Sequence, residues 1–305
     1  MSAPPKVVQR DFQLARLTTV RTGGAADWFA RPGDEEDLVA MLGWADAEGL
    51  PVGVIGSGSN LLVADAGFHG LALKLDGELA RIEQEGERRV ICGGGYRFPS
   101  AAAKTANWGL SGLEFGVNIP GTAGGAVRMN ANAYGGQLAE VLEWVEIATP
   151  EGMVLRSPEQ LGFSYRRSNL RSGEVVAKVG FQLKPADPDE IRATLAGMRE
   201  RRREAQPSGI KTFGSTFKNP EDERAEGRSA GQLLEAAGCR GLRHGGARFS
   251  EKHANFVEND RDATTADVLE LMAEGRRRVH EHFGVELEPE VQILGEVEWP
   301  DGWDL

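Results

Sequence analysis

Two glycine-rich segments carry the residues best suited to holding a phosphate group. The first is Gly56-Ser57-Gly58-Ser59-Asn60-Leu61, which directly follows the apolar run PVGVI. Glycines let consecutive backbone amides turn toward one point, and small hydroxyls add donors, so the segment could form a nest for a pyrophosphate. Leu61 stands where a GxGxxG fingerprint has its third glycine, and no Walker Gly-Lys-Ser/Thr follows. A simple tight turn is an equal alternative for this segment taken alone.

The second segment, residues 118–136, combines Gly121, Gly124 and Gly125 with the run MNANAYGG. Inside regular structure a glycine costs about 0.5–1 kcal/mol relative to alanine, so a packed strand or helix gains nothing from so many. A ligand that lies directly on the backbone explains them. A generic glycine-rich loop is the alternative.

The elements that must position these segments follow from hydrophobic periodicity and capping. Asp34 can cap a helix over residues 34–50, and the strands PVGVI and GLALKL follow it. Next come a hairpin turning near residues 85–87, a helix opened by Pro99, a hairpin turning at residues 150–152 and the strand EVVAKVGFQL. Alternation of helices and strands predicts two α/β subdomains, residues 1–78 and 79–187.

A boundary follows at KPADPDE, where prolines and acidic residues interrupt the pattern. Beyond it we expect a long helix ended by Pro207, the segment TFGSTFKNP, helices over AGQLLEAAG and TADVLELMAEGRRRVHEHFG, and a final strand VELEPEVQILG. The fold class is therefore α+β, with a C-terminal α+β domain spanning residues 188–305.

Composition excludes several classes of protein. The 305 residues are 40% hydrophobic and 27% charged, as expected of a folded globular chain. A net charge of −11 argues against binding nucleic acid, and the basic run Arg199–Arg203, broken by Glu200, is typical of a solvated helix face. We find no apolar run of the roughly 18 residues that a membrane helix needs and no N-terminal leader pattern, so we expect a cytoplasmic protein.

The cysteines and histidines do not indicate a metal site. Cys92 and Cys239 are too few for a disulfide framework and are interpreted as small buried residues. The five histidines show no zinc-binding spacing. No metal is expected.

GSGSNLLV, followed further on by IPGTAGGAVRMNANAYGG, resembles the FAD-binding fold of the vanillyl-alcohol oxidase or PCMH type. More closely, the chain resembles the UDP-N-acetylenolpyruvoylglucosamine reductase family, in its shorter form, from Thr19 to Gly295. The further blocks that match this family are YRRS at 165–168, GSTFKNP at 214–220, SEKHANF at 250–256 and LEPEV at 287–291.

The resemblance implies a PCMH-type FAD-binding fold that holds FAD without a covalent bond. By that resemblance the cofactor-binding residues are Gly56, Ser57, Gly58, Ser59, Asn60, Leu61, Pro120, Gly121, Thr122, Gly124, Gly125, Asn130, Ala133 and Tyr134. The family usually has glycine where this chain has Asn132, and asparagine tolerates a left-handed backbone better than most residues. We therefore expect that turn to survive.

The resemblance also implies the chemistry. The family uses NADPH and FAD to reduce the enolpyruvyl ether of a UDP-sugar, so negative charge that develops beside a carboxylate must be stabilised and a carbon protonated. Arg166 is implied as the stabilising cation, Ser215 as the proton donor and Glu290 as an assisting carboxylate. Arg167 is interpreted as a surface arginine on an extended segment. Glu288 shares the expected strand face of Glu290 and is its rival on geometry alone.

Substrate contacts are expected from Tyr165, Asn219, Lys252, His253 and Asn255, although His253 is equally well explained as a structural histidine. The short stretch between Arg166 and Ser215 has no counterpart of the tyrosine loop that caps substrate in the longer form. We expect a monomer in which NADPH and substrate use one pocket in turn. The alternatives are another non-covalent FAD oxidoreductase of the PCMH fold and a flavin-binding subunit of a redox complex.

Overall fold

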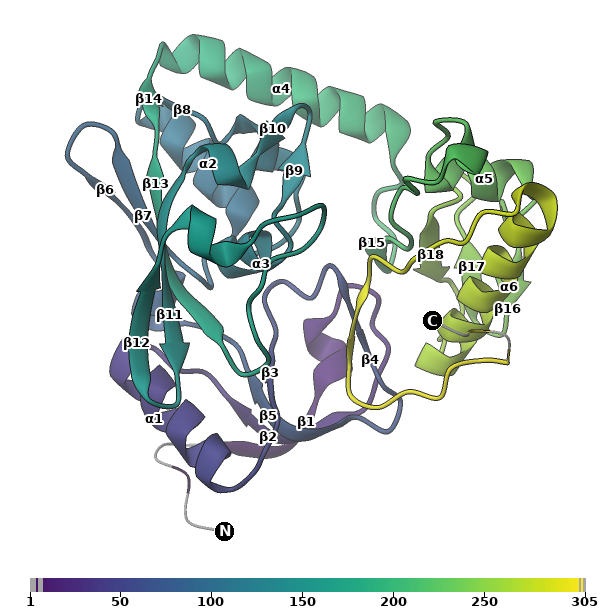
Figure 1. Ribbon diagram of the computed structural model, residues 1–305, viewed down its shortest axis with the longest axis horizontal. Helices are drawn as coiled ribbons and strands as arrows, with labels where there is room; N and C mark the ends of the chain where they lie inside the picture. Colours follow the sequence, from purple (N-terminus) through teal and green to yellow (C-terminus); the bar gives the residue numbers. More distant parts are fainter. Residues whose placement is uncertain (1–3, 5–7, 302, 304–305) are drawn as a thin grey trace. The chain divides into compact units, whose positions relative to one another are not determined.

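The computed structural model describes residues 4, 8–301 and 303, and these residues divide between two units that interleave along the chain (Figure 1). The first unit holds the described residues of 1–10 together with 28–57 and 69–202. The second holds residues 11–27, 58–68 and the described residues from 203 onward. The expected segments 1–78, 79–187 and 188–305 follow chain order, whereas these units do not, so that division stays a prediction.

Helix α1 (Glu35–Ala47) begins where the sequence predicts. The Asp34 carboxylate accepts a hydrogen bond from the Asp37 amide at 2.8 Å and so satisfies a donor that the helix start leaves open. Its buried face, which includes Leu38 and Leu42, belongs to a hydrophobic cluster shared with Leu71 and Leu73. The helix thereby packs on the strand Phe68–Leu73, whose end lies beside the first glycine-rich segment.

Two sheets frame the first glycine-rich segments. One has the order β1-β2-β5-β3, with β3 parallel to β5, and the other has the antiparallel order β12-β11-β13-β7-β6. Their strands are β1 (Gln9–Gln13), β2 (Ala25–Ala30), β3 (Val52–Val54), β5 (Phe68–Leu73), β6 (Ile82–Glu85), β7 (Arg89–Gly93), β11 (Leu142–Thr149), β12 (Gly152–Arg156) and β13 (Val175–Gln182). Both expected hairpins are confirmed, with Gly86 and Gly152 at φ +65° and +135° in their turns.

Helices and short pairs complete the first unit. Phe98, at the start of α2, packs on Phe115 and Phe181 with ring centroids 5.8 and 6.4 Å apart. The helices are α2 (Phe98–Asn107), α3 (Ala123–Arg128) and α4 (Pro188–Ala205), and the short strands are β8 (Leu110–Ser111), β9 (Asn132–Ala133), β10 (Gly136–Gln137) and β14 (Lys184–Pro185). This core holds the second glycine-rich segment against the five-stranded sheet.

The second unit is built on an antiparallel sheet of order β15-β18-β17-β16, with α5 and α6 packed together beside it (Figure 1). A parallel pair, β4 and β19, belongs to the same unit. The elements are β4 (Leu61–Val63), β15 (Thr212–Ser215), α5 (Ala230–Ala236), β16 (Arg243–His244), β17 (Ala247–Phe249), β18 (Phe256–Asn259), α6 (Thr265–Phe283) and β19 (Gln292–Leu294). Single 3-10 turns are η1 (Leu14–Leu17), η2 (Gly77–Ala80), η3 (Glu114–Asn118), η4 (Leu138–Glu140), η5 (Pro158–Leu161) and η6 (Glu223–Ala225).

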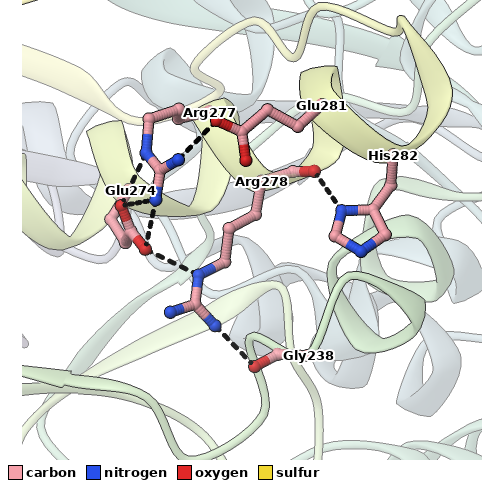
Figure 2. Close-up of polar contacts among 6 residues, drawn as sticks. All are labelled: Gly238, Glu274, Arg277, Arg278, Glu281 and His282. Carbon is pink, nitrogen blue, oxygen red and sulfur yellow. Dashed lines mark hydrogen bonds and ion pairs between the residues drawn. The ribbon is translucent and has the colours of Figure 1, made fainter.

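Helix α6 carries its charges in pairs along one surface (Figure 2). Glu274 accepts hydrogen bonds from Arg277 and Arg278, and Arg277 also pairs with Glu281. Arg278 reaches the carbonyl of Gly238 at 3.2 Å and ties the helix to the end of α5. Exposed pairs three or four residues apart contribute only about 0.3–0.5 kcal/mol each, so the buried face of α6 provides most of its stability.

One expectation about the C-terminal part needs correction. The long final strand was predicted wrongly, because Gln292–Leu294 forms a strand, whereas residues 285–291 have only an isolated bridge between Pro289 and Phe217. Pro289 has no amide hydrogen to donate to a ladder. Trp303, near the C-terminal end, is 4% exposed and lies in the core of the second unit.

No helix in the described ranges is both long enough and apolar enough to cross a membrane. Cys92 and Cys239 are buried free thiols, as predicted, and burial raises the pKa of Cys239 to about 11. Such thiols are protonated at neutral pH and make poor nucleophiles.

Candidate active site

The first glycine-rich segment begins directly after β3, as predicted. A Cβ placed on Gly56 would lie 2.7 Å from Oγ1 of Thr122, so packing inside the first unit already requires glycine there. The Lys74 ammonium, from the end of the parallel neighbour β5, donates a hydrogen bond to the Gly56 carbonyl. The carboxyl ends of β3 and β5 thus meet beside Thr122 of the second glycine-rich segment.

The second glycine-rich segment leaves open space where a ligand can approach. Thr122 caps α3 and accepts a hydrogen bond from the Gly125 amide at 3.3 Å. A Cβ on Gly121 or Gly135 would meet no atom within 4 Å, so the chain's own packing does not require glycine at Gly121. This favours the interpretation that the backbone there is kept clear for a bound molecule.

The left-handed residues of this segment are not the one expected. Asn130 and Tyr134 have φ of 40° and 53°, whereas Asn132 begins the short strand β9 and has no positive φ. Asn132 has no need of a left-handed backbone because it pairs with Gln137 across a tight hairpin. The left-handed backbone lies on either side of it, at Asn130 and Tyr134. Non-glycine residues adopt this conformation only when their surroundings hold them in it.

A cavity in the first unit joins both glycine-rich segments to the start of β13. Its lining residues are Val54, Ile55, Gly56, Lys74, Leu75, Gly94, Gly95, Thr122, Gly124, Gly125, Arg128, Leu170, Glu174, Val175 and Val176. Burial lowers the pKa of Lys74 within it, Arg31 lowers it further, and Asp76 acts in the opposite direction. The lining combines bare backbone and apolar side chains with the Lys74 ammonium, the Arg128 guanidinium and the Glu174 carboxylate, a mixture that suits part of a cofactor with both aromatic and phosphate groups.

Asn130 provides a second observation that fits a bound cofactor. Its amide nitrogen donates to the Ser164 carbonyl at 3.1 Å, while its buried Oδ1 has no hydrogen-bond partner among the described residues. A buried acceptor without a partner costs about 1–3 kcal/mol. A donor on a ligand would remove that cost.

Sequence reasoning missed several residues of this region. Lys74 interrupts the apolar strand GLALKL, and that lone charge was the available signal. Asn118 donates to Tyr134 at 2.9 Å and to the Met198 carbonyl at 2.8 Å, and the Arg202 guanidinium donates to the Asn118 carbonyl. The interpretation of the Arg199–Arg203 run as a solvated face is therefore wrong for Arg202, which anchors α4 to the second glycine-rich segment.

Tyr165 and Arg166 lie in a tight turn, not on the extended segment that the sequence predicted. The backbones of Ser164 and Arg167 exchange two hydrogen bonds of 3.1 Å, and Arg166 between them has φ of 55°. The Arg166 guanidinium donates to the Asn132 carbonyl at 3.4 Å and lies 5.6 Å from the Tyr165 ring. Arg167 is exposed, in agreement with its interpretation as a surface arginine.

In the second unit, Ser215 ends strand β15, opposite Phe256 of β18. Gly214 before it has φ +85°, and the register shifts between Thr212 and Ser215. On the other side, the Glu290 amide donates to the Thr216 carbonyl at 2.8 Å. The Glu290 backbone is thus bonded to the residue that directly follows Ser215.

The second half of the GSGSN segment lies at the same place. The Asn60 side-chain Nδ2 donates to the Glu290 carbonyl at 3.2 Å, and a Cβ on Gly214 would lie 3.6 Å from the Ser59 carbonyl oxygen. Glu288, the rival of Glu290, is 70% exposed and pairs with Lys218 at 3.0 Å. Glu288 therefore faces solvent in a surface ion pair, and the bond between the Glu290 and Thr216 backbones favours Glu290 as the candidate.

The expected substrate-contact residues of the second unit have partners of their own. The Asn219 side chain accepts from the Ala230 amide at 3.1 Å, and Lys252 donates to the Arg203 carbonyl at 2.7 Å. His253 and Asn255 are bonded to each other, and Asn255 is bonded to Phe217. Among the described residues, no group of His, Cys, Asp and Glu side chains is arranged to hold a metal ion.

The predicted catalytic residues fall into two groups. Arg166 lies in the first unit with the cavity and both glycine-rich turns, whereas Ser215 and Glu290 lie in the second. The class of protein follows from the sequence. A family profile described as FAD binding domain matches residues 26–157, so the chain is a FAD-dependent oxidoreductase.

A second profile, described as UDP-N-acetylenolpyruvoylglucosamine reductase, C-terminal domain, matches residues 206–294. The reductase of that name from Erythrobacter litoralis is 44% identical, over 92% of this chain and 86% of its own. Reductase 2 of Symbiobacterium thermophilum is 43% identical, over 97% and 94%. The crystal structure of the Thermus caldophilus reductase superposes with a TM-score of 0.81 at 37% identity, covering 96% of this chain and 99% of that one. The chain belongs to the UDP-N-acetylenolpyruvoylglucosamine reductase family.

Proposed function

We propose that this protein reduces the enolpyruvyl group of UDP-N-acetylenolpyruvoylglucosamine to give UDP-N-acetylmuramate, with FAD as cofactor and NADPH as hydride donor. The reaction is a step of peptidoglycan precursor synthesis. Support comes from relatives that are 44% and 43% identical over almost the whole chain and carry the reductase name. The observation that supports the assignment of the site is the hydrogen bond from the Glu290 amide to the carbonyl of Thr216, the residue that directly follows Ser215.

The substrate presents an alkene conjugated to a carboxylate. The hydride for the terminal alkene carbon would come from bound, reduced FAD, because such chemistry belongs to the cofactor and not to side chains. The remaining carbon then bears negative charge that spreads into the carboxylate. We assign the stabilisation of this charge to Arg166, whose planar guanidinium matches a carboxylate better than an ammonium does.

We assign protonation of that carbon to Ser215. A serine hydroxyl is a weak acid, so its donation depends on an environment that compensates for the charge left on its oxygen. Glu290 can orient a water or the substrate and return a proton to Ser215 after each turnover. Tyr165, Asn219, Lys252 and His253 are proposed to contact the substrate, whereas the Asn255 side chain is bonded to the Phe217 backbone.

We propose that NADPH uses no separate domain and that the nicotinamide enters the pocket that later receives substrate. This predicts ping-pong turnover, with parallel initial-rate lines when one substrate is varied at several concentrations of the other. Intersecting lines would contradict a shared pocket. A monomer in the cytoplasm is proposed as well, to be checked by sedimentation and cell fractionation.

The test uses the purified protein with its flavin. Its visible spectrum is recorded, and NADPH absorbance is followed with and without the enolpyruvyl-UDP-sugar. Oxidation of NADPH that requires this sugar supports the reductase. Flavin without sugar-dependent oxidation would favour the alternatives, another non-covalent FAD oxidoreductase of the PCMH fold or a flavin-binding subunit of a redox complex. Flavin that stays with denatured, precipitated protein would contradict non-covalent binding.

A further inference from the structure

Asn255 was expected to contact substrate, but its side chain is committed to the backbone that follows Ser215. It is 4% exposed, its Oδ1 accepts from the Phe217 amide at 2.9 Å and its Nδ2 donates to the Phe217 carbonyl at 2.8 Å. We propose that Asn255 is a positioning residue that fixes Ser215 at the place from which it donates a proton. This inference rests on the proposed function, which assigns that proton to Ser215.

The strand that carries Ser215 needs such support because its regular ladder is interrupted. Gly214 adopts φ +85°, and the register between β15 and β18 shifts between Thr212 and Ser215. A bulge of this kind leaves backbone groups without their ladder partners and re-aims the side chain beside it. The Asn255 side-chain amide bonds both the N–H and the carbonyl of Phe217. It therefore takes the place of backbone hydrogen bonds that a regular strand pair would make.

The backbone of Asn255 extends this hold to the residue next to Ser215. The Thr216 amide donates to the Asn255 carbonyl at 2.8 Å, while the Thr216 carbonyl accepts from the Glu290 amide at 2.8 Å. Thr216 is therefore bonded on both edges, to Asn255 on one and to Glu290 on the other. Ser215 directly precedes Thr216, so the hydrogen bonds that hold the Thr216 backbone also restrain the position of Ser215.

His253 holds Asn255 in turn. Its Nδ1 accepts from the Asn255 amide at 3.2 Å, and its ring packs on Phe256 with centroids 4.9 Å apart. A Cβ placed on Gly231 of α5 would lie 2.8 Å from Cε1 of His253, so the helix backbone closes on the imidazole. This packing restrains the ring and keeps its Nδ1 beside the Asn255 backbone amide.

The expected effect of losing this support follows from the geometry that proton transfer requires. A donor must stand within hydrogen-bond reach of the reacting atom, and a misplacement of about 1 Å can cost about 100-fold in rate. Asn255→Ala should therefore slow oxidation of the reduced flavin by the enolpyruvyl sugar about 100-fold. Reduction of the flavin by NADPH requires no proton from Ser215 and should stay within about twofold of wild type.

Asn259 gives a matched control at the other end of β18. It is 7% exposed, its Nδ2 donates to the Val20 carbonyl at 2.9 Å and its Oδ1 accepts from the Ala263 amide at 2.8 Å. Asn259→Ala thus removes a buried amide with the same number of backbone bonds, remote from Ser215 in the sheet. Both variants should lose similar stability, and only Asn255→Ala should lose the sugar-dependent half-reaction.

The readouts separate positioning from general destabilisation. The two half-reactions are followed by stopped-flow flavin absorbance, in H₂O and D₂O. We expect Asn255→Ala to lower kcat with KM for the sugar nearly unchanged, and to raise the solvent isotope effect on flavin oxidation because protonation limits the rate. Equal losses in both variants, or a wild-type rate in Asn255→Ala, would overturn the inference. A wild-type enzyme without sugar-dependent turnover would instead overturn the proposed function.

Hydrogen–deuterium exchange keeps the inference testable if Asn255→Ala does not fold. Asn255→Asp keeps the size of the side chain and an acceptor for the Phe217 amide, and it should speed exchange in residues 212–219 and slow the same half-reaction. In the wild-type protein the amides of Thr216 and Phe217 should exchange as slowly as those of β18. This exchange can be measured even if neither variant folds. Fast exchange at these two amides would contradict the proposed support.

Discussion

The loop at residues 118–136 in the first unit and the chain around Ser215 in the second are both rich in small residues, yet they are built in opposite ways. The first leaves space: a Cβ on Gly121 would meet nothing within 4 Å, and Asn130 keeps a buried oxygen without a partner among the described residues. The second is bonded on both edges, through Asn255 and Glu290. A large cofactor requires surface kept clear, whereas a proton donor requires one atom held in one place.

The largest expected effect comes from removing the atom that the second region holds. Ser215→Ala should slow sugar-dependent flavin oxidation by about 10²–10⁴-fold, the range that a general acid contributes. Flavin reduction by NADPH should be spared, and Ser215→Cys should recover part of the rate because a thiol is also a proton donor. Stopped-flow measurement of both half-reactions checks this. Ser208→Ala, at an exposed position of the same unit, is the control.

Arg166 tests whether the first region also contains a precisely held group. Arg166→Ala should lower the same half-reaction about 10²–10³-fold, the loss typical of removing one donor that stabilises developing charge. Arg166→Lys should rescue little, since a lysine lacks the planar fork. The exposed neighbour gives the control Arg167→Ala. If Arg166→Ala weakened only FAD binding, Arg166 would belong with the space-forming residues, and the contrast between the regions would sharpen.

The elements were predictable where local signals were strong. The Asp34 cap, both hairpin turns and the helices α2, α4, α5 and α6 lie where periodicity and turn residues predict them. The strand β4 was missed, since it is three residues long and pairs with β19, more than two hundred residues away in sequence. No local pattern encodes such a partner. The burial of Trp303 was not predictable either, because it depends on contacts with a core that no pattern in the closing residues indicates.

The site divides in the same way. Motifs indicated Ser215, Arg166 and Glu290, because their neighbours resemble a known family. The motifs did not indicate what Asn255 or Arg202 does, since each acts on a backbone group that the fold brings to it. Arg166 was expected on an extended segment, and its left-handed turn depends on hydrogen bonds between Ser164 and Arg167 that a sequence pattern does not reveal.

A smaller effect is expected from the half-buried ammonium of the cofactor cavity. Lys74→Met keeps the length of the side chain but removes the charge and the hydrogen bond to the Gly56 carbonyl. FAD affinity of the apoprotein should fall about tenfold, which equals about 1.4 kcal/mol, and its dependence on salt should weaken. Titration by flavin fluorescence measures both. Lys184→Met, at an exposed strand position, is the control, and an unchanged affinity in Lys74→Met would remove Lys74 from the cofactor site.

The smallest effect concerns pH and the support behind Ser215. Burial lowers the pKa of His253 below its ordinary value and Arg240 lowers it further, while a backbone hydrogen bond and Glu235 act in the opposite direction. An imidazole that is neutral when folded can accept the Asn255 amide at Nδ1, and protonation removes that acceptor. Because the folded state binds fewer protons than the unfolded state, stability should be complete above about pH 6.5 and fall as pH drops toward the lowered folded value, with a slope of at most about 1.4 kcal/mol per pH unit.

Urea unfolding of the wild type and of His253→Gln at pH 7 and pH 5 measures this contribution. The variant has no group that titrates at this position, so the difference between its two midpoints should be smaller than that of the wild type. His282→Gln is the control, since His282 lies on the exposed surface of α6 with its Nδ1 bonded to the Arg278 carbonyl at 2.9 Å (Figure 2). If His253→Gln kept the wild-type difference, acid would act elsewhere in the second unit, and the firm hold on Ser215 would not depend on a neutral His253.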